Sequence, residues 1–353
     1  MKRHLIQTMT LVLALASAPA LAAVTAQEAA RLGADLTPLG AERKGNAEGT
    51  IPAWEGGLSS PAKAGFASWK PTDHRPDPYA GDKPLFTITA ANMAQYAGRL
   101  TEGQKKLLQQ YKSTYKMLVY PTHRSAAVPQ RIYDATKRIA TTAQLAAGGN
   151  GVTHAGEGIP FPIPREGVEV FWNHILRYRA NAVVRRIGQA PVTVSGDYAM
   201  VRFIDDTFAA YSLPGATSEN LNNIILYFIQ ETTAPARLAG EILLVQETLD
   251  QSIENRKAWV YNPGQRRVRR APNVAFDNPG TNSDNLRTSD QLDMYNGSPQ
   301  RYDWKLVGKK EIYVPYNAYK LADKKLKYKP DIIHKGTINS DLMRYELHRV
   351  WEV

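Results

Sequence analysis

The sequence contains few groupings of side chains that could carry out catalysis. Six histidines lie beyond residue 23, and none stands four residues from another or at the spacing of a zinc site: His74, His123, His154, His174, His334 and His348. The chain has no cysteine, which excludes thiolate metal ligands, a cysteine nucleophile and disulfide bonds. The glycine-containing motifs of serine hydrolases, phosphate-binding loops and dinucleotide-binding folds are absent. We therefore expect no catalytic residues, no metal site and no cofactor.

The remaining candidates for chemistry have structural interpretations. Asp205 and Asp206 are adjacent carboxylates, but neighbours on a strand point to opposite faces. Glu231 and Glu247 are either buried or paired with arginines. His174 lies in a predicted helix, where a hydrogen-bonded boundary histidine is the usual finding. A hydrolase of the cell envelope is the least favoured function, because it requires His174 to meet a carboxylate and a hydroxyl in one pocket.

Cationic side chains are concentrated on a predicted β-hairpin. Two strands, 257–261 and 266–270, flank a turn with proline at its second position and glycine at its third. Four arginines crowd the returning strand: Arg266, Arg267, Arg269 and Arg270. They form either a charged edge strand that blocks aggregation or a site that contacts anions such as lipid headgroups. The net charge of +11 also favours an anionic partner such as phospholipid or lipopolysaccharide.

One predicted strand is apolar on both faces. Its residues 224–229 read Ile-Ile-Leu-Tyr-Phe-Ile, whereas a half-exposed antiparallel strand would alternate. Both faces therefore need cover, from the helices and from the N-terminal segment. The covered face is either packed core or the wall of an apolar cavity that accepts a lipid chain. The candidate cavity residues are Leu226, Phe228, Leu244, Trp259 and Tyr261.

The elements that position these residues divide the chain into two halves. Helical spacing predicts helices over 25–32, 87–97, 101–118, 130–147, 166–179 and 286–295. Thr101 with Gln104 forms a capping box. Alternation predicts strands over 192–194, 198–204, 221–232, 237–249, 257–261, 266–270, 302–314 and 343–351. Most predicted helices lie in the first half of the chain and the predicted strands in the second, and this separation indicates an α+β fold.

The N-terminus is typical of a cleaved secretion signal. A positive start is followed by an apolar stretch and then by Ala20-Leu21-Ala22, which suits signal peptidase. Cleavage near Ala22 makes residues 1–22 a signal peptide and places the protein in the periplasm. We expect peripheral contact with the outer membrane and no binding of nucleic acid.

Residues 23–86 are rich in proline and glycine but also carry several large aromatic side chains. Proline and glycine at this density oppose helix and strand, whereas a free linker has little use for aromatic residues. We interpret this segment as an extended arm over the body, with five aromatic anchors: Trp54, Phe66, Trp69, Tyr79 and Phe86.

The hairpin sequence 258–272 resembles the exported proteins of the domain-of-unknown-function 1329 family. Three further segments carry the same resemblance: the opening at 36–42 with 51–54, Phe171-Trp172-Asn173-His174, and 302–317. The resemblance thus covers nearly the whole chain beyond the signal. It implies a relation to the LolA/LolB superfamily.

That relation implies an unclosed antiparallel β-barrel with helices against its concave face, here preceded by the long Pro/Gly-rich arm. The family resemblance also implies that the protein functions together with an RND-type exporter and an outer-membrane partner. We therefore expect a non-enzymatic carrier or chaperone for a lipid or another hydrophobic molecule. The alternative is a structural or adaptor subunit of the export system.

The last residues, Trp351-Glu352-Val353, lie within a predicted strand. Members of the family are usually longer at this end, so we expect residues 87–353 to form one domain that is truncated at its C-terminus.

Overall fold

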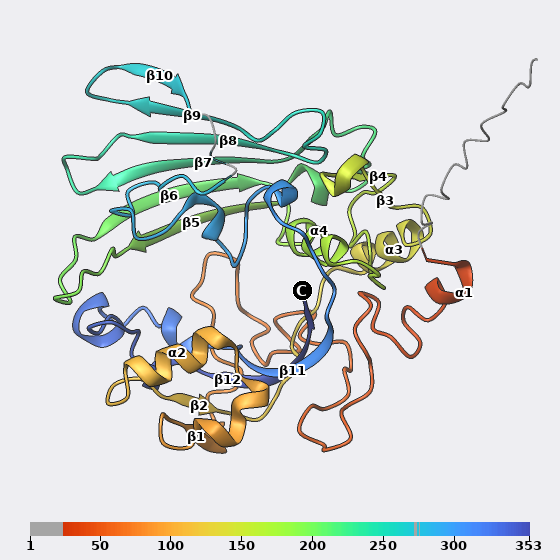
Figure 1. Cartoon of the computed structure of the whole chain (residues 1–353), viewed down its shortest axis with the longest axis horizontal. Helices are drawn as coiled ribbons and strands as arrows, with labels where there is room; N and C mark the ends of the chain where they lie inside the picture. The colour runs from red at the N-terminus through yellow and green to blue at the C-terminus, as the bar shows by residue number, and fades with distance from the viewer. Residues whose placement is uncertain (1–23, 272–273, 275) are drawn as a thin grey trace, which may run out of the picture.

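A computed structural model describes residues 24–271, 274 and 276–353. The predicted signal peptide, residues 1–22, lies outside the described part. The described chain contains a six-stranded sheet, a four-stranded sheet and a two-stranded ribbon. Figure 1 shows the two larger sheets as separate layers, with α3 and α4 beside one end of the six-stranded sheet.

The six-stranded sheet is an antiparallel meander in which each strand pairs with its neighbour in sequence. Its strands are β5 Ala182–Gln189, β6 Val201–Phe208, β7 Ile224–Ala234, β8 Ile242–Thr248, β9 Lys257–Asn262 and β10 Arg267–Arg270. Predicted strands match β9 and β10 closely, whereas β6 and β7 begin three residues and β8 five residues later than predicted, and β5 was not predicted. The predicted strand 192–194 is wrong, because these residues lie in the loop between β5 and β6.

The four-stranded sheet joins the two ends of the chain. Its order is β1 Phe86–Ile88, β2 Met117–Val119, β12 Tyr345–Glu352 and β11 Gly308–Pro315. The contact of β12 with β2 is parallel and has one pair, Tyr345 with Val119. The helices predicted over 87–97 and 101–118 were therefore too long, because a strand occupies one end of each. Pairing with a distant strand outweighed the local helical spacing.

The described helices are short. They are α1 Ala26–Ala29, α2 Glu102–Gln110, α3 Gln130–Ile139 and α4 Gly167–Leu176. The capping box of Thr101 and Gln104 at the start of α2 is confirmed. The predicted helix 130–147 ends early, and the ribbon of β3 Gln144–Leu145 and β4 Val152–Thr153 follows it. The predicted helix 286–295 is only the 3-10 turn Ser289–Gln291.

The remaining short elements are helical turns between the strands. Six are 3-10 turns and one is a π turn: Met93–Arg99, Ala147–Gly149, Ala210–Ser212, Pro299–Arg301, Tyr319–Ala322, Ser340–Leu342 and the π turn Tyr328–Ile332.

One face of the six-stranded sheet, here called the inner face, is covered. A buried cluster around Trp172 of α4 includes Ile225 and Leu249 and packs on this face. The segment after β10 also covers it, since Gln189 of β5 donates to the carbonyls of Thr281 and Asn282. A second core lies over the four-stranded sheet and includes Ile51 of the arm, Leu108 and Met117.

The fold class is mixed α+β, as predicted, and none of the described sheets closes into a barrel. Within the described residues, no helix is long and apolar enough to cross a bilayer.

Candidate functional site

One cavity lies under the N-terminal arm, and we call it the arm cavity. Its volume is about 370 Å³, within the usual range of small-molecule sites. Its walls come from the arm, from α3 and α4, and from β11 and β12. The lining residues are Thr37, Leu39, Gly40, Ala41, Glu42, Ile51, Trp54, Arg124, Ala126, Tyr133, Ile159, Pro162, Asn173, Lys309, Tyr316, His348, Arg349, Val350 and Trp351.

The arm approaches the body closely because of Gly40. This residue has φ +90°, and a Cβ placed on it would lie 1.7 Å from the carbonyl oxygen of Pro162. Only glycine combines this backbone conformation with such a close approach. Gly40 thus sets how near the arm lies to the 159–164 loop, and so shapes one wall of the cavity.

Arg124 ties the arm to the segment after β2. Its guanidinium donates to the carbonyl oxygens of Glu42 at 2.8 Å, Arg43 at 3.0 Å and Pro52 at 3.5 Å. Trp54 adds a hydrogen bond from its Nε1 to the carbonyl of Ala126 at 3.0 Å. These hydrogen bonds hold residues 42–54 of the arm against the body.

Three of the five predicted aromatic anchors also pack against rings of the body. Trp54 meets Tyr133 edge-on, and Phe86 stacks on Tyr96. Tyr79 stacks on the imidazole of His123 with ring centres 3.9 Å apart.

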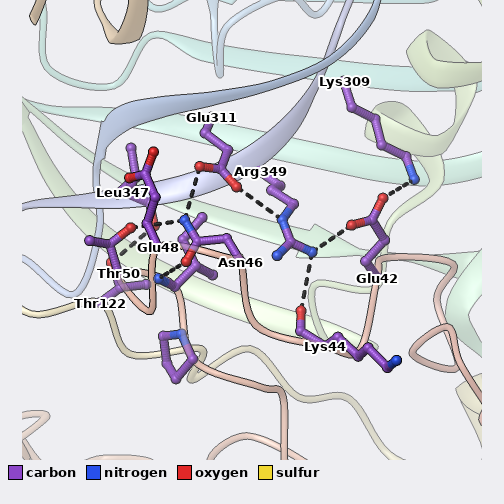
Figure 2. Close-up of polar contacts among 12 residues, drawn as sticks. Glu42, Lys44, Asn46, Glu48, Thr50, Thr122, Lys309, Glu311, Leu347 and Arg349 are labelled. Atoms are coloured by element: carbon purple, nitrogen blue, oxygen red, sulfur yellow. Dashed lines mark hydrogen bonds and ion pairs between the residues drawn. The ribbon is translucent and has the colours of Figure 1, made fainter.

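A network of ion pairs joins the arm to β11 and β12 at the rim of the cavity (Figure 2). Glu42 accepts from Lys309 at 2.6 Å through one oxygen and from Arg349 at 2.6 Å through the other. Arg349 also donates to Glu311 at 3.2 Å, and Asn46 of the arm donates to the same carboxylate at 3.0 Å. The hydrogen bond from Lys309 is the main reason why the pKa of Glu42 lies below its ordinary value.

The lining carries more positive than negative charge. Its cations are Arg124, Lys309 and Arg349, and its one carboxylate is Glu42, which leaves +3 − 1 = +2. Glu311 lies behind the lining and offsets one further charge by holding Arg349. Arg124 has no carboxylate within ion-pair distance among the described residues. Burial and then the nearby charge of Arg349 lower the pKa of Arg124, as expected for a cation that lacks an anion.

A buried polar network lies behind the cavity wall that His348 forms. The Glu346 carboxylate has no solvent exposure. It accepts hydrogen bonds from Arg344 at 2.7 Å, Asn317 at 3.0 Å, His348 at 3.1 Å and the backbone N–H of His123 at 2.8 Å.

Asp82 extends this network. It accepts from Arg344 at 2.6 Å and from the ring of His123 at 2.8 Å. Burial alone would raise the pKa of Glu346 and of Asp82, but these hydrogen bonds outweigh burial and hold both pKa values below the ordinary ones. The network is therefore a stable, charged support for β12.

A smaller cavity, here called the sheet cavity, lies between α4 and the inner face of the six-stranded sheet. Its volume is about 190 Å³, and its walls include Leu176 and the predicted residue Leu226. Several charged residues also line it, and they are paired. Arg185 binds Asp205 at 2.8 Å, and Glu247 is held by Arg256 at 2.5 Å. The predicted cavity on this face therefore exists, but it is small and partly ionic.

The five predicted cavity residues do not share one wall. Phe228 lies on the same face as Leu226, because the two stand two positions apart on β7. Leu244, Trp259 and Tyr261 lie on the opposite face, so their placement in this cavity was wrong. The register shows this, since Leu244 pairs with Ile229 and with Trp259, while the inner-face Val245 pairs with Phe228.

The four hairpin arginines are all exposed. Among the described residues, none of them has a carboxylate partner. Arg270 pairs with Trp259 and faces the same side, whereas Arg267 and Arg269 face the other side of this edge strand. Arg266 has φ 51° in the turn.

The structure does not assemble a hydrolase site around His174. Its Nε2 lies 2.9 Å from the carbonyl oxygen of Asp293, and its Nδ1 lies 3.1 Å from Arg177. Burial and then Arg177 lower its pKa. Asp205 is buried while Asp206 is exposed, as their strand positions predicted. Glu247 is both buried and paired with Arg256, so the two predicted alternatives occur together. Within the described residues, no group of three acidic or histidine side chains could hold a metal ion.

The arm cavity was not predicted from the sequence. One signal was available at β12, where Glu346 and His348 occupy alternate positions of the strand and Arg344, directly before the strand, continues the same spacing. Charged residues at this spacing share one face, and a face of a central strand is buried. The pattern therefore indicated a buried polar network, although not its partners.

Comparisons with known proteins place the chain in a family but assign it no activity. The profile described as "Protein of unknown function (DUF1329)" matches residues 87–353. The uncharacterized protein PA3922 of Pseudomonas aeruginosa is 54% identical over 353 residues, which cover 99% of this chain and 76% of the relative. No solved structure matches the chain. A match over these residues, together with this identity, shows that the chain belongs to the DUF1329 family.

Proposed function

We propose that this protein is a periplasmic carrier for an anionic amphiphile, a lipid or lipid-like molecule, which it holds in the arm cavity. The observation that carries the proposal is the excess positive charge in an otherwise largely apolar lining. Leu39, Ile51 and Trp351 offer apolar contacts for an acyl chain. Arg124 offers a guanidinium without a carboxylate partner, which could bind the anionic headgroup of the ligand. Each methylene of the ligand that is buried in the cavity contributes about 0.8 kcal/mol to the free energy of binding.

The charge balance also selects the class of ligand. A cation without an anion is costly to keep away from water, and a bound anion removes that cost. With Glu311 included, the cavity region carries +1, which is complementary to a single carboxylate or phosphate. A neutral hydrocarbon would leave the charge of Arg124 uncompensated.

The arrangement of α4 against an unclosed antiparallel sheet is what a LolA/LolB-like carrier would have. It supports the class of function, although the larger cavity lies under the arm and not on the sheet. We place the ligand under the arm for this reason. Release would require the arm to lift, and a partner in an export system is a natural trigger.

Tryptophan quenching by a brominated fatty acid tests the proposal directly. Trp54 and Trp351 line the cavity, so bound bromine atoms quench their emission. We expect saturable quenching that W54F/W351F removes and that W69F retains, because Trp69 lies in the arm outside the cavity. The methyl ester of the same acid should bind at least tenfold more weakly.

Native mass spectrometry of protein purified from the periplasm provides the second measurement. An anionic lipid should be retained by the protein and lost from Arg124→Gln, with Arg124→Lys as the charge-preserving control. Equal binding of acid and ester would overturn the charge selection. A lipid-free protein with a stoichiometric membrane partner would instead support the adaptor function.

A further inference from the structure

We infer that the outer face of the six-stranded sheet is a contact surface for an anionic lipid bilayer. The outer face is the side opposite α4, and the term refers here to Val184, Phe208, Tyr227, Ile229, Trp259 and Val268. This surface is separate from the arm cavity, and the inference does not depend on the proposed ligand.

The register shows that these residues share one side. Tyr227 pairs with Phe208, and Ile229 pairs with Leu244. Leu244 in turn pairs with Trp259, which pairs with Arg270 of β10. Directly opposed residues of antiparallel strands point to the same face, so an apolar stripe crosses from β6 to β10.

The stripe is open to solvent. Val184 and Val268 are each 63% exposed, Phe208 is 43%, Ile229 is 42% and Tyr227 is 39% exposed. Several large apolar side chains exposed on one continuous surface mark an interaction site. The inner face, by contrast, is covered by α4 and by the segment after β10.

Cations gather where the stripe ends. The hairpin supplies Arg266, Arg267, Arg269 and Arg270 at the edge of the sheet. The cations on the outer face itself are Arg270, Arg186 of β5, Arg202 of β6 and Lys257 of β9. The carboxylates on this face are Asp206 and Glu231, on β6 and β7. The strands therefore place +4 − 2 = +2 on this face, and Arg266, Arg267 and Arg269 add three more cations at the hairpin edge.

This combination matches a bilayer surface better than a second copy of the chain. Clustered arginines are attracted to anionic headgroups, whereas two copies of the same hairpin would repel each other. Tryptophan and tyrosine side chains favour the interface between headgroups and acyl chains, where Trp259 and Tyr227 would lie. The apolar residues would then enter only the upper part of the bilayer.

Vesicle co-sedimentation tests the inference. The purified protein is mixed with vesicles of phosphatidylcholine alone or of phosphatidylcholine with equal phosphatidylglycerol, at about 0.1 M salt, where charges are screened beyond about 10 Å. We expect binding to the anionic vesicles, little binding to the neutral ones, and loss of binding in high salt.

Two variants separate the charges from the apolar stripe. R266Q/R267Q/R269Q/R270Q should lose about fivefold in partitioning for each arginine removed. The matched control K63Q/K70Q/K106Q/K112Q removes the same charge from exposed positions in the arm and around α2 and should bind nearly as wild type. V184T/V268T should bind several-fold more weakly, while V194T/V307T, at exposed positions off the stripe, should bind as wild type.

Thermal unfolding of every variant shows whether the fold is retained. If the arginine and lysine variants lost equal amounts of vesicle binding, the total charge alone would govern binding, and the inference would fail. Equal binding to neutral vesicles would overturn it as well. So would a concentration-dependent dimer that V184T/V268T dissociates, because the face would then bind a second copy.

Discussion

The guanidinium of Arg349 in the last strand donates to the carboxylate of Glu42 in the arm at 2.6 Å, across 307 positions of sequence. Lys309 binds the other oxygen of the same carboxylate. Glu42 thus anchors the arm through ion pairs and is also the one negative charge in the lining of the arm cavity. Removing its charge should therefore lower the stability of the protein but raise its affinity for an anionic ligand.

Replacing Glu42 with glutamine should loosen the arm slightly and strengthen the binding of an anion. The ion pairs are partly exposed, so we expect a loss of about 0.5–1 kcal/mol in the free energy of unfolding. The freed cations should raise the affinity for a fatty acid several-fold. Chemical denaturation and quenching titrations measure the two effects.

Glu48→Gln is the matched control for this experiment. Glu48 also lies in the arm and binds Arg99 at 2.6 Å, but it does not line the cavity. It should lose similar stability and keep the wild-type affinity. If both variants bound the ligand alike, Glu42 would not oppose an anion in the cavity.

A methyl group at Gly40 should detach the arm from the body. Gly40→Ala adds a clash with the Pro162 carbonyl to the strain of a positive φ, and we expect a loss of more than about 2 kcal/mol. Gly33→Ala has nearly the same φ, +88°, with nothing within 4 Å of the added methyl. It should lose only about 1 kcal/mol.

Limited proteolysis of the arm distinguishes the two glycine variants. Gly40→Ala should be cleaved within the arm much faster than wild type and should lose ligand quenching, whereas Gly33→Ala should retain it. Similar proteolysis of both variants would contradict the close approach of Gly40 to Pro162.

The buried Glu346 network should control stability in acid. Its carboxyl pKa lies below the ordinary value, as does that of Asp82. Each group therefore adds stability that is complete above the unfolded pKa of about 4 and is lost as pH falls through the folded pKa. We expect Glu346→Gln to cost about 3 kcal/mol at neutral pH and to flatten the acid limb of the stability profile.

Glu352→Gln removes a carboxylate from the same strand, where it is 43% exposed and bound to Lys310. This control should cost less than about 1 kcal/mol and keep the acid limb of wild type. Urea denaturation between pH 3 and 7 gives both profiles. A flat limb in the control, or an unchanged limb in Glu346→Gln, would assign the acid sensitivity to other groups.

Local features of this fold could be predicted from sequence, because their partners lie close by in the chain. The capping box of Thr101 and Gln104 spans three residues, and the hairpin of β9 and β10 closes over a short turn. Helical spacing wrongly extends the predicted helix over residues 117 and 118 of β2, because the strand partner Tyr345 lies more than 220 residues away. Helical spacing carries no information about such a partner.

The candidate site could not be predicted from the sequence, because its residues are also far apart in the chain. The arm cavity brings together residues from the arm, the middle of the chain and the last strand. The charges that define it, Arg124, Lys309 and Arg349, look like ordinary surface residues in the sequence. Strand alternation could have separated Leu226 from Leu244, but the phase of each strand depends on pairing with its neighbours.

The two faces of the six-stranded sheet predict unequal effects of two identical substitutions. Leu226 lines the sheet cavity and packs against the Trp172 core, so Leu226→Ala should cost about 2–3 kcal/mol. Leu244 lies on the outer face beside the exposed Ile229, and Leu244→Ala should cost about 1 kcal/mol or less. Urea denaturation measures both free energies of unfolding. Equal losses would mean that the outer face is covered in the folded protein, and a larger loss at Leu244 would reverse the assignment of inner and outer faces.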